Sequence, residues 1–366
     1  MKLFFLNEQQ SVRRIDWWFC GAIFFLITFG LLMQYSIGVN QEISNLSSFY
    51  KQLLLILVGI GLFVALCIVD YRFIKAHPLF YFIVGTGLLV AVLLFGRELK
   101  GTTGWFIIGS ISIQPVEFVK LLFILCIAMY FDKDISLMQR TKFFLISGGI
   151  AAFFIGLIIL QPDLGSAFIL FVIWYGYALL LKAPRFFLIL IPIMMIFAVI
   201  IGWFFLFSPY QKDRLQIFID PSSDPRGAGY HVTQSMVAIG SGSIWGRGIG
   251  LGTQSQLHFL PEVTSDFIFA AIAEELGFVG VVVLVMALSI ILIRLWKYMI
   301  TTKENYAFLF VVGIFIYFAA QSILVIGMNI GMLPVTGLPL PLVSAGGSSM
   351  ISTLIMLGIA HRIGYS

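Results

Sequence analysis

Six ionisable side chains of this 366-residue chain lie within long apolar stretches or at their edges. They are Glu117, Lys120, Asp163, Asp266, Glu274 and Glu275. An ionised side chain at the centre of a membrane-spanning helix costs about 2.5–3.5 kcal/mol on insertion scales, so such residues are rare and usually have a partner or a function. These six are therefore the first candidates for chemistry.

Asp266 is the strongest of these candidates because of where it stands. A polar segment, residues 208–265, interrupts the apolar sequence and ends in Ser265, and an apolar helix resumes at Asp266. A carboxylate in such a position can act as a general base, an effect of about 10²–10⁴ in rate. The alternative is a helix N-cap, although Ser265 could supply that cap without a buried charge.

Glu117 and Lys120 are three residues apart, so they share one face of a helix. They form either a local ion pair between packed helices or one wall of a wet cavity in which Lys120 meets an anionic lipid headgroup. Asp163 lies in a Pro-Asp-Leu-Gly turn. That position favours a role as N-cap of the following helix.

Three uncharged features add to this set. Trp105 is either an interfacial aromatic anchor or a stacking platform for a sugar. The glycine-rich run 240–252 matches neither a dinucleotide fingerprint nor a P-loop, so we expect tight turns, with backbone contact to a pyrophosphate as the lesser alternative. Residues 329–349 are apolar, yet three prolines forbid a helix in their middle. This pattern predicts a buried outer loop followed by a closely packed helix start.

The scaffold that positions these residues is a membrane protein. The sequence is 60% hydrophobic and only 11% charged, and runs long enough to cross a bilayer recur along it. Because lipid offers no partner to free backbone groups, the sequence predicts one all-α polytopic domain over residues 1–366. Ten spans are expected, at about 16–38, 52–69, 77–95, 115–131, 143–160, 165–182, 185–207, 267–295, 305–328 and 343–361.

The eighth span is too long for a single crossing and contains Glu274 and Glu275. Its first turns are expected to line a cavity or project outward before the purely apolar part begins near Phe278. Lys and Arg favour a cytoplasmic N-terminus, with fourteen inside against three in short outer loops. That orientation places the loop 208–265 outside, between spans seven and eight, and both termini in the cytoplasm.

Other classes of site are not indicated. The first fifteen residues are polar and basic, and no small-residue cleavage site follows the first apolar run, so a cleavable signal is not expected. Cys20, Cys67 and Cys126 lie in apolar runs without disulfide or metal spacing. The basic residues are spread through loops, so they indicate membrane topology and no nucleic acid partner.

Several ordered blocks together resemble one family, the SEDS proteins (shape, elongation, division and sporulation). The blocks are Gln114-Pro-Val-Glu117-Phe-Val-Lys120, Gln161-Pro-Asp163-Leu-Gly165, Asp220 to Gln234-Ser235, Leu260 to Gly277 with Asp266 inside, and Asn329 to Ser349 with Ser344 inside. The resemblance covers essentially the whole chain. Within the family, Gly229-Tyr230-His231 and Gly252-Thr-Gln-Ser255 are most similar to the elongation branch.

The resemblance implies a peptidoglycan glycosyltransferase of the bacterial cytoplasmic (inner) membrane that polymerises lipid II, a disaccharide-pentapeptide on undecaprenyl pyrophosphate. It places the essential carboxylate on Asp266, the family's tryptophan on Trp105, and its paired glutamate and lysine on Glu117 and Lys120. Four further residues are expected to bind substrate or support the site, namely Asp163, Arg214, Gln234 and Ser344. It also implies a class B penicillin-binding protein as partner and an elongation complex around both. The family usually has His-Thr before the aspartate, whereas this chain has Thr264-Ser265, so any role of that imidazole is absent.

Positive charge for the departing pyrophosphate would come from Arg214, Lys120 or a divalent cation. The sequence shows no ligand set for a resident metal, so Mg²⁺ or Mn²⁺ would be held by Asp266 and the substrate pyrophosphate together. The rival functions are a lipid II flippase or transporter, a division-type polymerase and a scaffold without chemistry. A transporter predicts internal repeats with broken helices, and the sequence shows no such symmetry.

Overall fold

The structure is a computed structural model that describes residues 15–39, 46–99, 101–109, 111–205, 207, 209–221, 224, 227–257, 259–260 and 262–365. One long helix lies at each of the ten predicted spans. These helices are α2 (Trp17–Val39), α3 (Leu46–Ile68), α4 (Pro78–Phe95), α5 (Pro115–Tyr130), α6 (Thr141–Ile159), α7 (Leu164–Leu180), α8 (Arg185–Phe205), α12 (Ile268–Thr301), α13 (Asn305–Asn329) and α14 (Gly347–Gly364).

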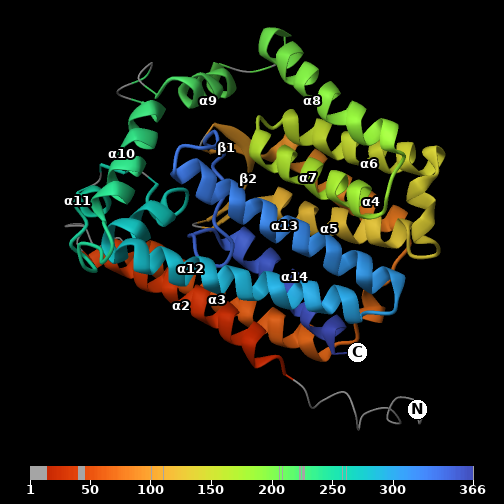
Figure 1. Cartoon of the computed structure of the whole chain (residues 1–366), viewed down its shortest axis with the longest axis horizontal. Coiled ribbons are helices and arrows are strands. Elements are labelled where there is room, and N and C mark those ends of the chain that lie inside the picture. Colours follow the sequence, from red (N-terminus) through yellow and green to blue (C-terminus); the bar gives the residue numbers. More distant parts are fainter. Residues whose placement is uncertain are drawn as a thin grey trace.

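Seven of these helices, namely α2, α3, α4, α6, α8, α12 and α13, are long and apolar enough to cross a membrane by length and composition alone. The other three are α5 and α7, with 16 and 17 residues, and α14, whose first turn is rich in serine. The chain is therefore an all-helical polytopic membrane protein. Figure 1 shows α13 in the middle of the bundle and α8 along its edge, in keeping with their 67% and 6% buried shares.

The polar segment between α8 and α12 is itself helical. It contains α9 (Pro209–Ile219), α10 (Ala228–Ser241) and the single turn α11 (Thr253–Gln256). These three helices cover the end of the bundle that lies opposite the C-terminus (Figure 1). The sequence predicted only a long loop here, because the polar composition and frequent glycines of this segment disfavour helix outside a packed structure.

A small antiparallel sheet lies between α4 and α5, and the all-α expectation missed it. Its strands are β1 (Arg97–Leu99), β2 (Thr102–Ile108) and β3 (Ile111–Ile113), in the order β1-β2-β3. Trp105 on β2 is paired with Arg97 of β1. Short 3₁₀ turns, η1 (Tyr71–Ile74) and η2 (Ile135–Gln139), occupy connections at the other end of the bundle.

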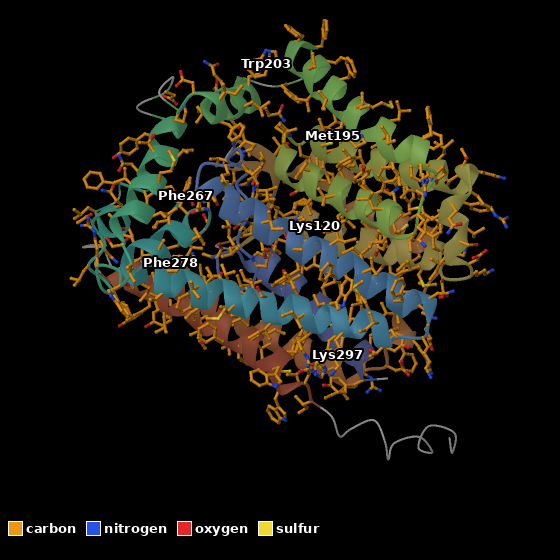
Figure 2. The ribbon with its side chains drawn as sticks, in the orientation of Figure 1. Lys120, Met195, Trp203, Phe267, Phe278 and Lys297 are labelled. Atoms are coloured by element: carbon orange, nitrogen blue, oxygen red, sulfur yellow. The ribbon has the colours of Figure 1, made fainter. Side chains whose placement is uncertain are left out.

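Helix α12 is bent at Gly277. Gly277 has φ 65° and ψ −162°, a conformation that only glycine adopts readily. The bend separates a first segment, residues 268–276, from the apolar remainder that begins at Phe278. Figure 2 shows Phe267 and Phe278 at the two ends of this first segment. The helix continues to Thr301, six residues beyond the predicted end of the span.

The glycine-rich run lies against this bend. A Cβ on Gly277 would stand 2.3 Å from the amide nitrogen of Gly246, and a Cβ on Gly246, which has φ 79°, would stand 2.2 Å from the carbonyl oxygen of Glu275. The amide of Gly248 donates to that same carbonyl at 2.9 Å. The tight turns predicted for this run therefore exist, and they allow two backbones to cross in contact.

The carboxylates of Glu274 and Glu275 are fully buried and serve this crossing. Glu274 accepts the amides of Gln254 and Ser255 at 2.8 and 2.9 Å. Glu275 accepts the amide of Gly250 at 3.0 Å and the hydroxyl of Ser36 at 2.9 Å. Both carboxylates thus hold the outer segment and α2 against α12. Two of the six ionisable residues singled out in the sequence therefore have a structural role.

Candidate active site

Asp266 lies at the junction of the polar segment and α12, with only 8% of its surface exposed. Helix α12 begins at Ile268, its N-cap is Phe267, and no side chain caps it. The hydroxyl of Ser265 bonds instead to the carboxylate of Glu262 at 3.0 Å. The N-cap position of α12 is therefore Phe267 and not Asp266, for which capping was the alternative role.

The backbone before Asp266 is fixed by the loop that precedes α14. The hydroxyl of Ser344 donates to the carbonyl of Ser265 at 2.6 Å, and the amide of Ala345 donates to the carbonyl of Thr264 at 2.8 Å. Ser344 also accepts the amide of Leu340 at 2.8 Å. Ser344 is therefore a positioning residue for the carboxylate. Thr264 and Ser265, at the positions where histidine and threonine are usual, supply carbonyl groups to this contact.

Asn329, the last residue of α13, fixes the backbone after Asp266. Its side-chain nitrogen donates to the carbonyl of Asp266 at 2.9 Å, and its side-chain oxygen accepts the amide of Ala270 at 3.2 Å. Its own carbonyl accepts the hydroxyl of Ser235 on α10 at 2.8 Å. Asn329 thus joins α13 to the start of α12 through its side-chain amide and to α10 through its backbone carbonyl.

The Arg214 guanidinium and the Asp266 carboxylate both lie close to Gly337. From the place where a Cβ on Gly337 would stand, Nη2 of Arg214 is 3.4 Å away and Oδ2 of Asp266 is 3.5 Å away. Arg214 comes from α9 and is half-buried. Because Gly337 has no side chain, a cation and an anion from separate elements converge on one open point beside the loop 330–346.

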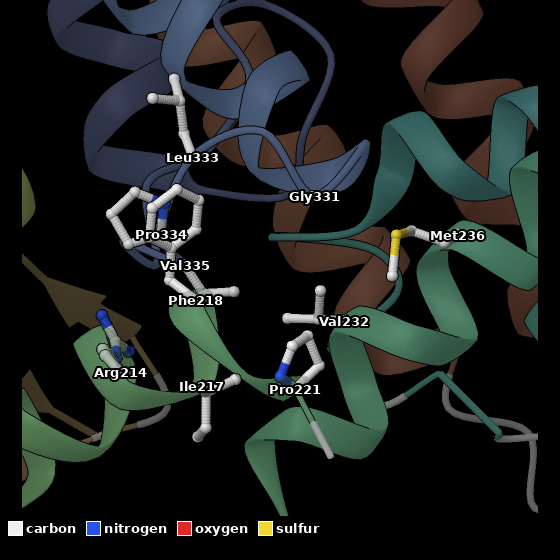
Figure 3. A pocket seen from close by; sticks show the side chains of 10 residues that line it. All are labelled: Arg214, Ile217, Phe218, Pro221, Val232, Met236, Gly331, Leu333, Pro334 and Val335. Atoms are coloured by element: carbon white, nitrogen blue, oxygen red, sulfur yellow. The ribbon is translucent and has the colours of Figure 1, made fainter. Parts of the chain in front are cut away.

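Arg214 also lines a small cavity of about 30 Å³, with room for about one water molecule. Figure 3 shows that its walls come from α9, α10 and the segment 331–335. The lining is apolar apart from Arg214, which is its charged member. An arginine in apolar surroundings is poorly screened and therefore exerts a strong field on a nearby anion.

His231 precedes the cavity-lining Val232 on α10, and it does not add to the positive charge beside the cavity. Burial lowers the pKa of the His231 imidazole, and the charge of Asp224 only partly opposes that effect. The ring is therefore neutral near pH 7. Among the described residues that line the cavity, Arg214 is the one that carries a positive charge.

Glu117 and Lys120 form the local ion pair that their spacing predicted. The two side chains lie 2.6 Å apart and are 1% and 0% exposed. Lys120 also donates to the side-chain oxygen of Gln321 on α13 at 3.3 Å, and Gln321 donates to the carbonyl of Pro339 at 2.8 Å. Figure 2 places Lys120 in the middle of the bundle. In this conformation Lys120 is closed off from any lipid headgroup, contrary to the cavity-wall alternative.

Asp163 caps α7, as its turn suggested. Its Oδ1 accepts the amide of Ser166 at 2.9 Å, and its Oδ2 accepts the side-chain amide of Gln114 at 3.3 Å. The backbone amide of Gln114 donates to Ser348 at 2.9 Å. Asp163 therefore links the start of α7 to the start of α5 and, through Gln114, to α14.

Trp105 and Gln234 are the two remaining candidates from the sequence. Trp105 is half-buried on β2, and its indole nitrogen donates to Thr102 at 3.2 Å. Gln234 is half-buried on α10, one residue before the Ser235 that bonds Asn329. The contacts with Asp266 described above come from other residues, so the roles of Trp105 and Gln234 in binding stay predictions.

The donor set around Asp266 does not fit a metal held by the protein alone. Within the part of the chain that the structure describes, no three His, Cys, Asp or Glu side chains gather in a possible metal site. The Arg214 guanidinium lies near the same point as the Asp266 carboxylate. A divalent ion held jointly with a substrate pyrophosphate stays a prediction.

Gln321 and Asn329 are the contacts that the sequence did not single out. Both are amides within the otherwise apolar α13, eight residues apart and so on one helix face. A polar amide in a membrane span commonly bonds across helices, and this signal could have found them. They carry no charge, so they do not belong to the ionisable residues that mark the site in the sequence.

Comparison with known proteins identifies the family. Residues 17–366 match the family described as "Cell cycle protein", FtsW/RodA/SpoVE. The chain is 39% identical to the peptidoglycan glycosyltransferase MrdB of Escherichia coli K12, over 84% of this chain and 83% of that protein. It is 35% identical to the probable peptidoglycan glycosyltransferase FtsW of Thiomicrospira cyclica, over 98% of this chain and 93% of that one.

Two solved structures share the fold. The crystal structure of the rod shape determining protein RodA of Thermus thermophilus has a TM-score of 0.71 at 25% identity and covers 96% of this chain and 97% of its own. A chain from a structure of a peptidoglycan synthase complex that coordinates polymerization and crosslinking has a TM-score of 0.79 at 27% identity, with 95% and 97% covered. The chain therefore belongs to the SEDS family of FtsW- and RodA-type proteins and is a multi-pass membrane peptidoglycan glycosyltransferase.

Proposed function

We propose that this chain polymerises lipid II into glycan strands, with Asp266 as the general base and Arg214 as the group that receives the leaving pyrophosphate. The observation that carries the proposal is that both side chains lie close to Gly337, beside the start of α12. Both groups must be within reach of the same anomeric carbon, with the base on the side of the attacking hydroxyl and the cation on the side of the leaving pyrophosphate.

In the proposed reaction an acceptor sugar hydroxyl attacks the anomeric carbon of the donor. The new bond joins the hydroxyl oxygen to that carbon, and the bond from the carbon to the pyrophosphate oxygen breaks. The hydroxyl proton passes to Asp266, and the electron pair leaves with undecaprenyl pyrophosphate, whose negative charge Arg214 stabilises. A single displacement inverts the configuration at the sugar. The buried contacts of Asn329 and Ser344 keep the carboxylate in place while the proton moves.

The test is Asp266→Asn in purified protein supplied with lipid II. Because the amide cannot accept the proton, glycan strand formation should fall by about 10²–10⁴, while the thermal unfolding midpoint stays near that of the parent protein. Asp213→Asn is the matched control, since Asp213 is an exposed carboxylate on α9 next to Arg214. It should polymerise as the parent does.

Full activity of the Asp266→Asn protein would remove Asp266 from the chemistry. A lipid II flippase would give a different result, because strand formation would be absent in the parent protein and lipid II would only change leaflet. The same assay therefore separates the polymerase from the transporter.

Elongation is the proposed cellular role, in a complex with a class B penicillin-binding protein of the bacterial inner membrane. The MrdB and RodA likenesses support elongation, and the synthase complex supports a crosslinking partner. A division role is the second candidate, favoured by the similarity to FtsW proteins at 34–35% identity. Co-purification with elongation-type or division-type penicillin-binding proteins distinguishes the two.

A further inference from the structure

A second, larger cavity lies at the end of the bundle remote from Asp266. It has a volume of about 670 Å³, within the range of about 300–1,000 Å³ that is typical of ligand pockets. Its walls come from the start of α4, the end of α5 and the middle of α6. The loop 70–77 beside it is bonded to Glu304, which joins α12 to α13. Asp266 precedes the opposite end of α12, so the cavity and the proposed catalytic site are at opposite membrane faces.

The interior of this cavity suits a hydrocarbon chain. Leu79, Phe82, Met129 and Ile150 line it, and Cys126 closes its floor. The cavity continues into an apolar outer surface, since Leu79, Phe80 and Ile83 are more than half exposed on α4. In a membrane-spanning bundle such a surface faces lipid tails. A chain from the surrounding leaflet can therefore enter the cavity sideways without crossing a polar barrier.

Lys133 supplies a positive charge, unpaired within the described part of the chain, at the polar rim of the cavity. Asp132 is neutralised, because its carboxylate accepts the amide of Tyr306 at 3.0 Å and lies 3.6 Å from Lys75. Lys75 and Arg72 both pair with Glu304, so this network of two cations and two anions has no net charge. Lys133, which also lines the cavity, is exposed and forms no ion pair with the residues that the structure describes.

His77 adds a hydrogen-bond donor at the same rim. Its Nδ1 accepts the amide of Leu79 at 3.3 Å at the start of α4. A neutral imidazole that accepts at Nδ1 carries its proton on Nε2, so His77 presents an N–H at the rim. A lysine, an imidazole N–H and an apolar interior together match a molecule with an anionic phosphate head and a long apolar tail.

We propose that this cavity binds an anionic phospholipid of the surrounding leaflet, with one acyl chain between α4 and α6 and the phosphate at Lys133 and His77. The leaflet on the face that carries most Lys and Arg is the one in which anionic lipid is attracted to basic side chains. The site is independent of the proposed catalysis, because none of its lining residues belongs to the surroundings of Asp266.

The test is native mass spectrometry of the purified full chain with phosphatidylglycerol, phosphatidylcholine or undecaprenyl phosphate added separately. The parent protein should retain phosphatidylglycerol in preference to the other two. Lys133→Gln should lower that retention about fivefold, as expected for the loss of one lysine near a lipid phosphate. Lys142→Gln is the matched control, because Lys142 is an exposed lysine at the start of α6 that does not line the cavity.

Ile150→Trp tests the interior separately from the rim, since the indole would fill space that an acyl chain needs. It should lower phosphatidylglycerol retention while the protein keeps its thermal unfolding midpoint. Equal retention of phosphatidylglycerol and phosphatidylcholine by the parent protein would overturn the proposal, as would unchanged retention by Lys133→Gln. Preferential retention of undecaprenyl phosphate would overturn the assignment to a phospholipid.

Discussion

The Glu117–Lys120 pair connects the centre of the bundle to the loop that faces Asp266. Lys120 bonds Gln321, and Gln321 bonds the carbonyl of Pro339, two residues from Gly337. Removing two charges from water is costly, and a buried pair offsets that cost only when its geometry is good. The intact pair therefore adds little to the stability of the protein. Removing one partner costs more, because the charge of the other is left buried and unpaired.

We predict that Lys120→Met alone destabilises the protein by about 3–5 kcal/mol, because it leaves the Glu117 carboxylate buried without a partner. Glu117→Leu combined with Lys120→Met should recover most of that loss. Thermal unfolding in detergent measures both variants, and strand formation from lipid II is measured on the same samples.

The double variant also tests the supporting role suggested by family resemblance. A protein that is stable but inactive would indicate that one of the two side chains acts on the substrate. Recovered activity would assign the pair to structure alone.

Sequence reasoning at this scale found the charged residues and missed the amides. The position after a polar segment made Asp266 a candidate, and family resemblance made it the predicted base. Asp163 was correctly predicted to be a helix cap. Asn329 and Gln321 make the contacts that hold the site, yet an uncharged amide in an apolar run gives a weaker signal than a carboxylate. The convergence of Arg214 with Asp266 could not be read from sequence, because it depends on how α9 lies against the loop 330–346.

Among the elements, α12 most directly determines where the carboxylate stands. Its first segment, residues 268–276, is bonded at one end to Asn329 and at the other to the glycine-rich run. The bend at Gly277 lets this segment depart from the direction of the membrane-spanning part. The position of Asp266 therefore depends on a backbone conformation eleven residues away.

Gly277→Ala should destabilise the protein and lower strand formation. A left-handed φ costs a non-glycine residue about 1–3 kcal/mol, and the new methyl group would stand 2.3 Å from the Gly246 nitrogen. Gly87→Ala in α4 is the matched control, because nothing lies within 4 Å of a Cβ at that position. Its thermal unfolding midpoint should be unchanged or slightly raised.

An equal effect of the two glycine substitutions would argue against a special role for the bend. A Gly277→Ala protein with normal stability and full activity would show that α12 can straighten without moving Asp266.

The elements that sequence reasoning located well were those with a continuous hydrophobic signal. Each predicted span has its helix, and the excess length of the eighth span set its first turns apart from the apolar part that begins near Phe278, although it did not predict the bend at Gly277. The strands were missed because β1 and β3 have three residues each, too few to show an alternating pattern. Helices α9 and α10 were missed because their stability comes from packing on the bundle rather than from their own composition.

At the scale of the whole molecule, the two ends of the bundle differ in character. One end carries α9–α11, the bent start of α12 and the closed cavity beside Arg214. The other carries the charged network of Arg72, Lys75 and Glu304 with the larger cavity. Hydropathy and the distribution of Lys and Arg were enough to predict this polarity, since they depend on composition along the chain and not on contacts across it.

This polarity gives a test of orientation. Single cysteines would be introduced at Asp213 and Lys303, both exposed and at opposite ends, after the three native cysteines are replaced by serine. In intact cells a membrane-impermeant maleimide should label Asp213→Cys, whereas Lys303→Cys should react only after permeabilisation. The reverse pattern would invert the topology and place Asp266 in the cytoplasm.

The contact between Gly246 and Gly277 has a consequence for how this protein can change over time. A Cβ at either position would collide with backbone atoms of the other segment, so no compensating substitution of a side chain there can make room for it. Large residues elsewhere in the interior can exchange volume with their neighbours, but a backbone has no volume to exchange. We expect this crossing to tolerate fewer substitutions than the surrounding apolar packing.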